Sequence, residues 1–214
     1  NERTGQICHS VYDVEFVYNK NDGLPIITSR PINHTAALAE LVGYLKGFSS
    51  AADFRRLGTK TWDANANKNA AWLANPHRKG VDDMGRVYGV QGRSWLSPIY
   101  RPHGALDHIN RTDQLAKIVH NLQQGIDDRG EILSFWNPGE FVTGCLRPCL
   151  YEYHFTIQYG KLHLRAQQRS CDAPLGLGFN SIQVYAFHQL MCQITGLEQG
   201  SARHCIDNAH VYDN

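Results

Sequence analysis

Apolar and polar residues alternate in four segments of the chain, and this pattern predicts four β-strands. The alternation is clearest in residues 151–158, where each of four large apolar side chains is followed by a polar one. Tyr159-Gly160 is a tight-turn signal, so residues 151–158 and 161–168 are expected to form a hairpin. The predicted strands cover residues 11–18, 132–137, 151–158 and 161–168.

Apolar residues at helical spacing predict three helices. Residues 35–46 and 113–124 each carry an aliphatic stripe, and each is followed by a glycine, which commonly ends a helix. The third helix lies within residues 173–197, which contain no Asp, Glu, Lys or Arg. Polar residues inside that stretch, such as Asn180 and His188, argue against a membrane span. We therefore expect a buried core helix.

Length and composition are typical of one globular domain covering residues 1–214. The chain is 42% hydrophobic and 10% aromatic, which suits a sizeable core and argues against disorder. A net charge of +1 argues against a non-specific nucleic-acid partner. No long, purely apolar stretch exists, so no membrane partner is expected. The predicted fold class is α/β or α+β with a mixed sheet.

Six cysteines are spread along the chain without a Cys-x-x-Cys pair. This is too sparse for a disulfide-rich secreted scaffold, so we expect mostly free thiols and a reducing, cytoplasmic location. A zinc site built from His188, Cys192, His204, Cys205 and His210 is the alternative for some of them. Their spacing fits no familiar zinc pattern, and no metal is expected.

Two features concern the outline of the chain. Residues 65–83 are rich in Asn, Ala, Lys and His and are predicted to be a surface excursion. The sequence starts at Asn1 without a methionine and stops abruptly, so we expect it to be part of a longer protein.

Glu40 is the only charged residue between Pro31 and Leu45. It lies on the face of the predicted helix opposite the leucines, where its neighbours are small or aromatic. Burial disfavours a carboxylate ion and raises its pKa, so Glu40 is a candidate proton-handling acid. The alternative is a single exposed Glu.

Cys149 directly precedes a predicted strand, in the sequence Leu146-Arg147-Pro148-Cys149. Pro148 restricts the local backbone, and the positive charge of Arg147 favours a thiolate. Cys149 is therefore a candidate nucleophile, and the alternative is a buried structural thiol.

The segment Gln168-Arg169-Ser170-Cys171-Asp172 places a guanidinium, a hydroxyl and a carboxylate directly after a strand. Arg and Ser suit an oxyanion such as phosphate, although a solvated turn is the simpler interpretation. Asn180 follows in the uncharged stretch and is predicted to be a buried amide. Such an amide needs partners, either in the backbone or on the edge of a heterocycle.

Taken together, these segments resemble the folate-dependent thymidylate synthase family, which includes deoxycytidylate hydroxymethylases. The most specific block is Gln168-Arg169-Ser170-Cys171-Asp172 followed by Leu175-Gly176-Leu177-Gly178-Phe179-Asn180. The resemblance runs from end to end apart from residues 65–83. The matching segments, in order, are 1–5, 39–41, 61–63, 87–91, 127–129, 136–140, 148–149, 168–172, 175–180 and 208–212.

The resemblance implies a fold, a reaction and an assembly. The fold would be a large, mixed, twisted sheet with flanking helices, and two copies would form a homodimer through their sheets. The reaction would be reductive methylation of deoxyuridylate (dUMP) to dTMP, with 5,10-methylenetetrahydrofolate becoming dihydrofolate. Cys149 would add to C6 of the pyrimidine and so make C5 nucleophilic.

The resemblance also assigns roles to individual residues. Asn180 would pair with N3 and O4 of uracil, because an amide donates and accepts at once. Arg129 would reach the phosphate from the partner subunit. The catalytic residues would be Cys149, Glu40, Tyr88, Arg169 and Asp172. The dUMP-binding residues would be Arg3, Arg129, Arg169, Ser170, Cys171, Asp172, Asn180, His210 and Tyr212. The folate-binding residues would be Asn33, Trp62, Leu146, Asp172, Leu175, Gly176 and Phe179.

Four positions depart from the family pattern. Leu150 stands where a His usually follows the nucleophile, and Gly130 replaces a second intersubunit arginine. Asn65 replaces a Trp, and Asn33 aligns with a His near the folate. Most of these changes fall on the folate side. The family's C-terminal segment, which closes over the folate, is expected to lie beyond residue 214.

Three alternatives remain open at this point. A nucleotide 5-hydroxymethylase acting on dUMP or dCMP would let water replace hydride, and exclusion of water decides between the two outcomes. A non-catalytic relative that binds nucleotide or RNA gains little support from the near-neutral charge. A thiol oxidoreductase using Cys145 and Cys149 has the wrong cysteine spacing.

Overall fold

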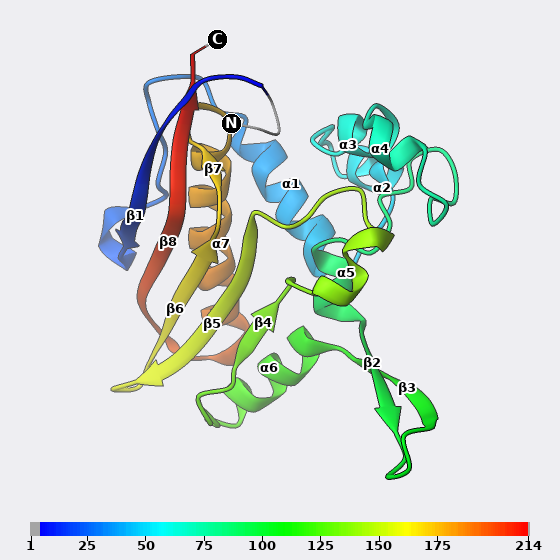
Figure 1. The fold of residues 1–214 in the computed structure, drawn as a ribbon. Helices are drawn as coiled ribbons and strands as arrows, with labels where there is room; N and C mark the ends of the chain where they lie inside the picture. The colour runs from blue at the N-terminus through cyan, green and yellow to red at the C-terminus, as the bar shows by residue number, and fades with distance from the viewer. Residues whose placement is uncertain (1–4, 214) are drawn as a thin grey trace.

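A six-stranded mixed sheet forms the centre of the molecule (Figure 1) in a computed structural model that describes residues 5–213. The strand order is β1-β8-β6-β5-β4, and β7 pairs with β8. β8 runs parallel to β6 and β7, and the other neighbours are antiparallel. The strands are β1 (Cys8–Tyr18), β4 (Ile132–Ser134), β5 (Leu150–Gln158), β6 (Lys161–Gln168), β7 (Cys171–Asp172) and β8 (Glu198–Tyr212).

The helices pack behind this sheet or extend away from it, and a second, two-stranded sheet forms an arm. The arm consists of β2 (Trp95–Tyr100) and β3 (Leu106–Thr112). The helices are α1 (His34–Leu45), α2 (Ala51–Arg56), α3 (Asp63–Asn67), α4 (Ala70–Leu73), α5 (Gly89–Arg93), α6 (Gln114–Gln123) and α7 (Gly178–Thr195). Shorter helical segments are η1 (Lys20–Asp22), η2 (Pro138–Thr143) and η3 (Ala173–Leu177), the last of which is π-helical.

α7 is the core helix that the uncharged stretch predicts. It packs against the inner face of the sheet and against α1 and α6. Phe187 and Met191 on this helix are fully buried with Phe155 of β5 and Leu164 of β6. Burial of most of the helix explains why the segment carries no charge. No helix within residues 5–213 combines the length and the apolar character needed to cross a membrane.

Most of the predicted elements are confirmed with small shifts at their ends. The β5–β6 hairpin turns at Tyr159-Gly160, where both residues have a positive φ. β4 ends at Ser134, three residues earlier than predicted, and β1 begins at Cys8, three residues earlier than predicted. The longest strand, β8, was not predicted, because charged residues such as Arg203 and Asp207 face outward among its buried ones.

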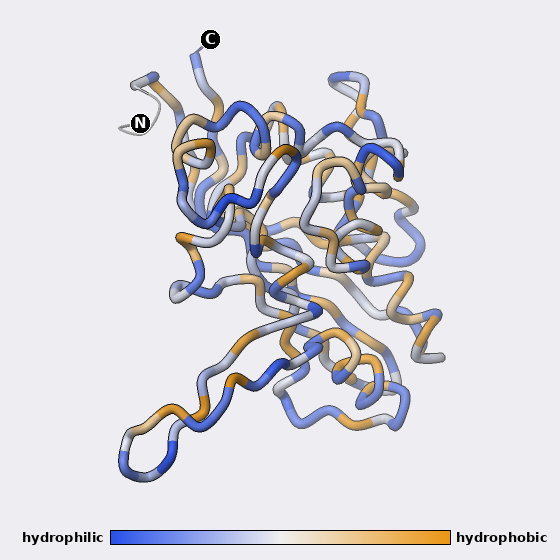
Figure 2. The backbone as a smooth tube through the Cα atoms, turned by 90° about the vertical axis from the view of Figure 1, so that its right-hand side faces the viewer, coloured by the Kyte–Doolittle hydropathy of each residue, from blue (hydrophilic) through white to orange (hydrophobic). Residues whose placement is uncertain are grey.

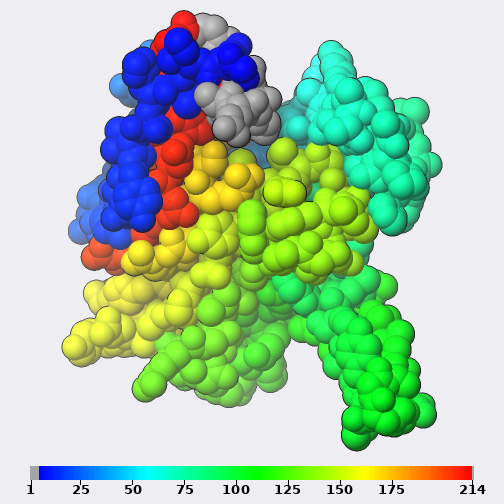
Figure 3. Space-filling model, viewed as in Figure 1, coloured from blue at the N-terminus to red at the C-terminus, as the bar shows by residue number. Residues whose placement is uncertain are grey.

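The opposite face of the sheet is not covered by any helix of residues 5–213 (Figures 1 and 3). Its side chains are those that alternate with the buried ones, and many are charged. Glu15 of β1 forms an ion pair with Arg203 of β8, and Arg165 of β6 lies 4.0 Å from Glu15. A broad, partly charged face is thus left open in the single chain.

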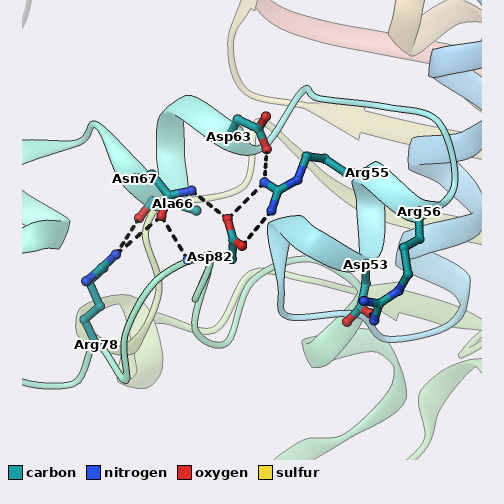
Figure 4. Close-up of polar contacts among 8 residues, drawn as sticks. All are labelled: Asp53, Arg55, Arg56, Asp63, Ala66, Asn67, Arg78 and Asp82. Carbon is teal, nitrogen blue, oxygen red and sulfur yellow. Dashed lines mark hydrogen bonds and ion pairs between the residues drawn. The ribbon is translucent and has the colours of Figure 1, made fainter.

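Residues 51–83 form a helical lobe beside the sheet (Figure 1). Arg55 bridges two carboxylates at 2.6 Å each, Asp63 and Asp82, and Asn67 donates to Asp82 at 2.8 Å (Figure 4). Trp72 is buried and donates its indole N–H to a backbone carbonyl. The segment predicted to be a surface excursion therefore contains two short helices and part of the core.

The β2–β3 arm extends away from the main body (Figure 2). Its paired strands expose Ile99, Tyr100, Leu106 and Ile109 to solvent. The sequence analysis predicted no strand here, because the arm lacks the one-sided alternation of a strand that packs on a core.

The inner face of β5 provides a test of the core. Phe155 is 0% exposed and packs against Phe187, whereas Tyr159 in the adjacent turn is 92% exposed. Phe155→Ala is expected to lower the free energy of unfolding by about 3–5 kcal/mol, and Tyr159→Ala by less than about 1 kcal/mol. Urea unfolding of both variants measures the difference. Equal losses would show that Phe155 does not anchor the core.

Candidate active site

Strand pairing brings Cys149 and Arg169 together. Leu150 pairs with Gln168 between β5 and β6, so the next residues, Cys149 and Arg169, also lie side by side. The Arg169 backbone N–H donates to the Cys149 carbonyl at 2.9 Å. Cys149 is half-buried and directly precedes β5, and Arg169 directly follows β6. The candidate nucleophile thus lies at the end of strand β5 rather than inside the core.

The Arg169 side chain folds over Cys149. Its Nη2 lies 4.0 Å from the Cys149 sulfur, and its Nε donates to the Pro148 carbonyl at 2.9 Å. The guanidinium also lies over the Trp136 ring, 5.5 Å from its centroid. These contacts hold a fixed positive charge beside the sulfur.

The sequence analysis assigned part of that positive charge to Arg147, and the structure corrects this. Arg147 is exposed, and its guanidinium lies over the Phe141 ring at 5.0 Å. Only its backbone carbonyl takes part in the site, as an acceptor from Arg169 Nη2 at 3.3 Å. The cation beside Cys149 is therefore Arg169.

Tyr88 binds the backbone of the nucleophile. Its hydroxyl accepts a hydrogen bond from the Cys149 N–H at 2.8 Å, and its ring stacks on Tyr44 at 4.8 Å. Tyr88 also has a φ of 40°, a conformation that costs a non-glycine residue about 1–3 kcal/mol. Burial raises the pKa of Tyr88 well above its ordinary value.

Glu40 on α1 is buried, as predicted. Burial raises its pKa above the ordinary value of 4.5, and hydrogen bonds from Thr61 and Gln183 offset part of that rise. Gln183 Nε2 lies 2.7 Å from Glu40 Oε2. The alternative of an exposed, solvated Glu is wrong, and Glu40 has the setting of a group that carries a proton.

Asn180 on α7 faces the same region, and its carboxamide is half-buried rather than fully buried as predicted. Its Oδ1 accepts from Gln168 Nε2 at 3.0 Å, and its Nδ2 donates to Gln183 Oε1 at 3.3 Å. Each of its polar atoms can still make one further hydrogen bond. Asn180 can therefore present a donor and an acceptor to a ligand.

The phosphate and sugar candidates line up along β7 and β8. Cys171 pairs with Ala209 and Asp172 with His210, while Ser170 lies just before β7. His210 is buried, and its Nδ1 lies 2.9 Å from Asn208 Oδ1. The centroid of its ring lies 5.2 Å from that of the Tyr212 ring. The side chain of Cys171 is buried, which leaves only its backbone to face a ligand.

The predicted folate residues come from several parts of the fold. Leu175 and Phe179 line a cavity of about 40 Å³ together with Ile32. Asp172 Oδ1 accepts from the Leu175 N–H at 3.2 Å, which leaves the second carboxylate oxygen of Asp172 for another partner. Gly176 is half-buried on the same segment.

The remaining three folate candidates have other neighbours. Trp62 is buried in an aromatic cluster with Tyr44 and Tyr88. Leu146 is half-buried near the nucleophile segment. Asn33 caps α1, because its side chain accepts from the Ala36 N–H at 2.9 Å.

Two predicted phosphate ligands are not placed at this site. Arg3 lies outside the described residues. Arg129 is exposed in the loop before β4, and its neighbour Asp127 accepts from the Ile157 N–H at 2.7 Å, near the far end of β5. Ile157 lies eight positions after Cys149 along extended backbone, or about 26 Å away. Arg129 cannot reach the nucleophile of its own chain.

The cysteines and two buried histidines considered as zinc ligands form no metal site in the described residues. All six cysteines are free thiols, in agreement with the sequence analysis. His188 Nε2 lies 2.7 Å from the Leu162 carbonyl, and His204 Nε2 lies 2.7 Å from Gln168 Oε1. Within residues 5–213, no three His, Cys, Asp or Glu residues are arranged to hold a metal ion.

The sequence analysis missed the role of two glutamines and one histidine. Gln168, Gln183 and His204 are buried and connect Asn180 to its surroundings. Gln183 follows Asn180 by three residues on one helix face, which was a usable signal. His204 gave no signal, because only the fold brings β8 against β6.

A half-exposed cysteine beside a fixed arginine, with a protonatable carboxyl and an amide facing the same region, is the arrangement of an enzyme site that uses a cysteine nucleophile. The family model described as thymidylate synthase matches residues 1–214. The chain belongs to the thymidylate synthase family. Its activity is that of a thymidylate synthase, a methyltransferase of dTMP biosynthesis.

Individual relatives agree with this assignment. Thymidylate synthases of Haemophilus influenzae and Pasteurella multocida are 58% and 56% identical to the chain over 215 residues, covering 100% of the chain and 73% of each relative. The crystal structure of thymidylate synthase from T4 phage superposes with a TM-score of 0.82 at 27% identity. That match covers 99% of this chain and 70% of the phage chain, and it confirms the predicted thymidylate synthase fold.

The raised pKa of Glu40 makes stability depend on pH. The folded chain holds the Glu40 proton more tightly than the unfolded chain, so stability is lost as pH rises above the ordinary value of 4.5. Glu40→Gln removes this ionisation. The variant is expected to be about as stable as the parent near pH 4 and more stable than the parent near pH 8. Urea unfolding at the two pH values tests this, and a stability difference that does not change with pH would contradict the assigned pKa shift.

Proposed function

We propose that the reaction proceeds through a covalent bond between the Cys149 sulfur and C6 of dUMP. The observation that carries this proposal is the pairing of a half-exposed Cys149 sulfur with Arg169 Nη2 at 4.0 Å. The thiolate adds to C6, and the C5–C6 π electrons move toward O4. The resulting enolate makes C5 a nucleophile, which uracil itself is not.

Asn180 and Glu40 then handle the negative charge and the protons of the ring. Asn180 Nδ2 donates to O4, where charge develops, and Asn180 Oδ1 accepts from N3–H. Glu40 keeps its proton more readily than an ordinary carboxyl, so it can deliver a proton to O4 and accept one from C5 through water. Tyr88 holds the Cys149 backbone in place during these steps.

The nucleotide's phosphate and sugar bind along the strand ends. For the phosphate bound in the site of the same chain, Arg169 and Ser170 are the ligands that residues 5–213 supply, since guanidinium and hydroxyl groups suit phosphate oxygens. Arg3 adds a further contact. His210 and Tyr212 on β8 hold the sugar hydroxyl, and the backbone of Cys171 and Asp172 borders the same edge.

The folate co-substrate binds beside the pyrimidine. 5,10-Methylenetetrahydrofolate supplies the one-carbon unit and the hydride when bound. The residues present fit this group: Asp172 keeps one carboxylate oxygen for a pterin N–H, and Leu175 adds an exposed apolar surface. The remaining folate contacts are assigned to Asn33, Trp62, Leu146, Gly176 and Phe179. The cytoplasmic location remains a prediction.

The enzyme works as a homodimer that joins the uncovered faces of two sheets. That face is broad and partly charged, with Glu15, Arg165 and Arg203 exposed on it. Arg129 follows Asp127, which binds the Ile157 N–H about 26 Å along β5 from Cys149 of the same chain, so we assign Arg129 to a phosphate in the partner's site. With Gly130 beside it, each chain contributes one arginine rather than two.

Removing the sulfur tests the covalent step. Cys149→Ser is expected to reduce dihydrofolate formation to less than about one-thousandth of the parent rate. Binding of dUMP, measured by calorimetry, should change by less than about tenfold, because Arg169 and Asn180 remain. Cys192→Ser on α7 is the matched control and should retain activity.

Activity retained by Cys149→Ser would refute the covalent role. The product of the parent enzyme separates the two activities of the family. Mass spectrometry should find dTMP, and a 5-hydroxymethyl nucleotide would assign the alternative hydroxymethylase reaction.

Mixing two defective variants tests the shared site. Arg129→Ala lacks the donated arginine, and Cys149→Ser lacks the nucleophile, so each is expected to be impaired alone. A hybrid dimer would pair an intact Cys149 with the partner's intact Arg129. Equal amounts of the two variants, unfolded and refolded together, should regain about a quarter of parent activity. No recovery, with hybrid dimers shown by native mass spectrometry, would place Arg129 outside the active site.

A further inference from the structure

The carboxamide of Asn180 lies between two glutamines that hold it from opposite sides. Gln168 Nε2 donates to Asn180 Oδ1 at 3.0 Å, and Asn180 Nδ2 donates to Gln183 Oε1 at 3.3 Å. An amide can rotate by half a turn with little change in shape, and this rotation exchanges its donor and its acceptor. The contacts of the two glutamines therefore determine which group Asn180 presents.

Gln168 is anchored by a group that can only accept. Its Nε2 donates to the Ser170 backbone carbonyl at 3.0 Å, so the nitrogen must point toward Ser170 and Asn180. Its oxygen then faces His204, whose Nε2 lies 2.7 Å away. For this short contact to be a hydrogen bond, His204 must carry its proton on Nε2.

His204 is suited to supply that single proton. It is fully buried on the inner face of β8, and burial lowers its pKa to about 4, so the imidazole is neutral. Its other nitrogen, Nδ1, lies 3.4 Å from the Tyr18 hydroxyl. A neutral imidazole has one donor and one acceptor nitrogen, and the oxygen of Gln168 takes the donor.

Gln183 is anchored in the same way from the other side. Its Nε2 donates to the Ala37 backbone carbonyl at 3.1 Å and to Glu40 Oε2 at 2.7 Å. Its oxygen is therefore left to face Asn180 Nδ2. The nitrogen of Asn180 consequently lies on the Glu40 side, and its oxygen lies on the Gln168 side.

The orientation of the Asn180 carboxamide determines which pyrimidine base it can recognise. Uracil offers an acceptor at O4 and a donor at N3, whereas cytosine offers a donor at N4 and an acceptor at N3. Asn180 held as described matches uracil and mismatches cytosine. A rotated Asn180 would do the reverse.

We propose that His204, Gln168 and Gln183 act as positioning residues that lock the carboxamide of Asn180 in the orientation that selects uracil over cytosine. This inference rests on the proposed role of Asn180 in binding dUMP. The positioning residues do not touch the base themselves. They act on base recognition indirectly: two backbone carbonyls and one buried imidazole proton fix the glutamines, and the glutamines orient Asn180.

Substitution of His204, which does not touch the base, tests whether this residue fixes the orientation of Asn180. His204→Leu removes the donor and leaves the oxygen of Gln168 unpaired, so the orientation of Gln168 rests on the Ser170 carbonyl alone and that of Asn180 is less strongly fixed. The ratio of dCMP to dUMP dissociation constants should fall by about 3- to 10-fold. His204→Gln keeps a donor within reach and should restore the ratio to within about twofold of the parent. Asn180→Asp favours cytosine directly and should give the lowest ratio of dCMP to dUMP dissociation constants in the series.

His188 provides the matched control. It is also a fully buried imidazole, with its Nε2 2.7 Å from the Leu162 carbonyl, but it makes no contact with the glutamines. His188→Leu should lose comparable stability and keep the parent's base preference. Gln183→Met tests the other side, and it should lower both the base preference and the turnover, because it also releases Glu40.

A spectroscopic measurement does not depend on any variant folding well. ¹⁵N chemical shifts of His204 in the parent protein should show a neutral ring protonated on Nε2. A ring protonated on Nδ1, or base preference unchanged in well-folded His204→Leu, would overturn the proposal. If the parent fails to bind dUMP, the proposed function fails instead, so the two failures are distinguishable.

Discussion

The pairing of β5 with β6 is the constraint on which the site depends. It fixes Cys149 at one strand end and Arg169 at the neighbouring strand end, and the backbone bond between them holds the register. A shift by one residue would turn every inward side chain of β5 outward. The apolar inner face of the hairpin, with Tyr153 and Phe155 against Phe187, therefore protects the geometry of the nucleophile.

The polar groups of the site are built into the core rather than laid on its surface. Glu40, Gln183, Gln168 and His204 are all buried and hydrogen-bonded to one another or to backbone carbonyls. Such groups are costly unless each has a partner, and they keep one geometry when each has one. The site gains a fixed arrangement of donors and acceptors before any ligand arrives.

Local patterns predicted the elements that pack on the core and the residues that carry the chemistry. Alternation located β5 and β6, and the missing charges located α7, because burial leaves those signals in the sequence. The partners of Asn180 were harder to predict, since Gln168 and His204 meet only through the parallel pairing of β6 with β8. The source of the charge beside Cys149 was similarly hidden, because Arg147 is closer in sequence but Arg169 is closer in space.

Tyr88 meets three structural demands at a single position. Its backbone occupies the left-handed region, its ring fills an aromatic stack, and its hydroxyl receives the Cys149 N–H. Glycine would relieve the torsion but empty the stack, and phenylalanine would keep the stack but orphan the amide. Each single replacement meets one demand by breaking another, so the site can require a tyrosine at position 88 even if Tyr88 takes no part in the reaction.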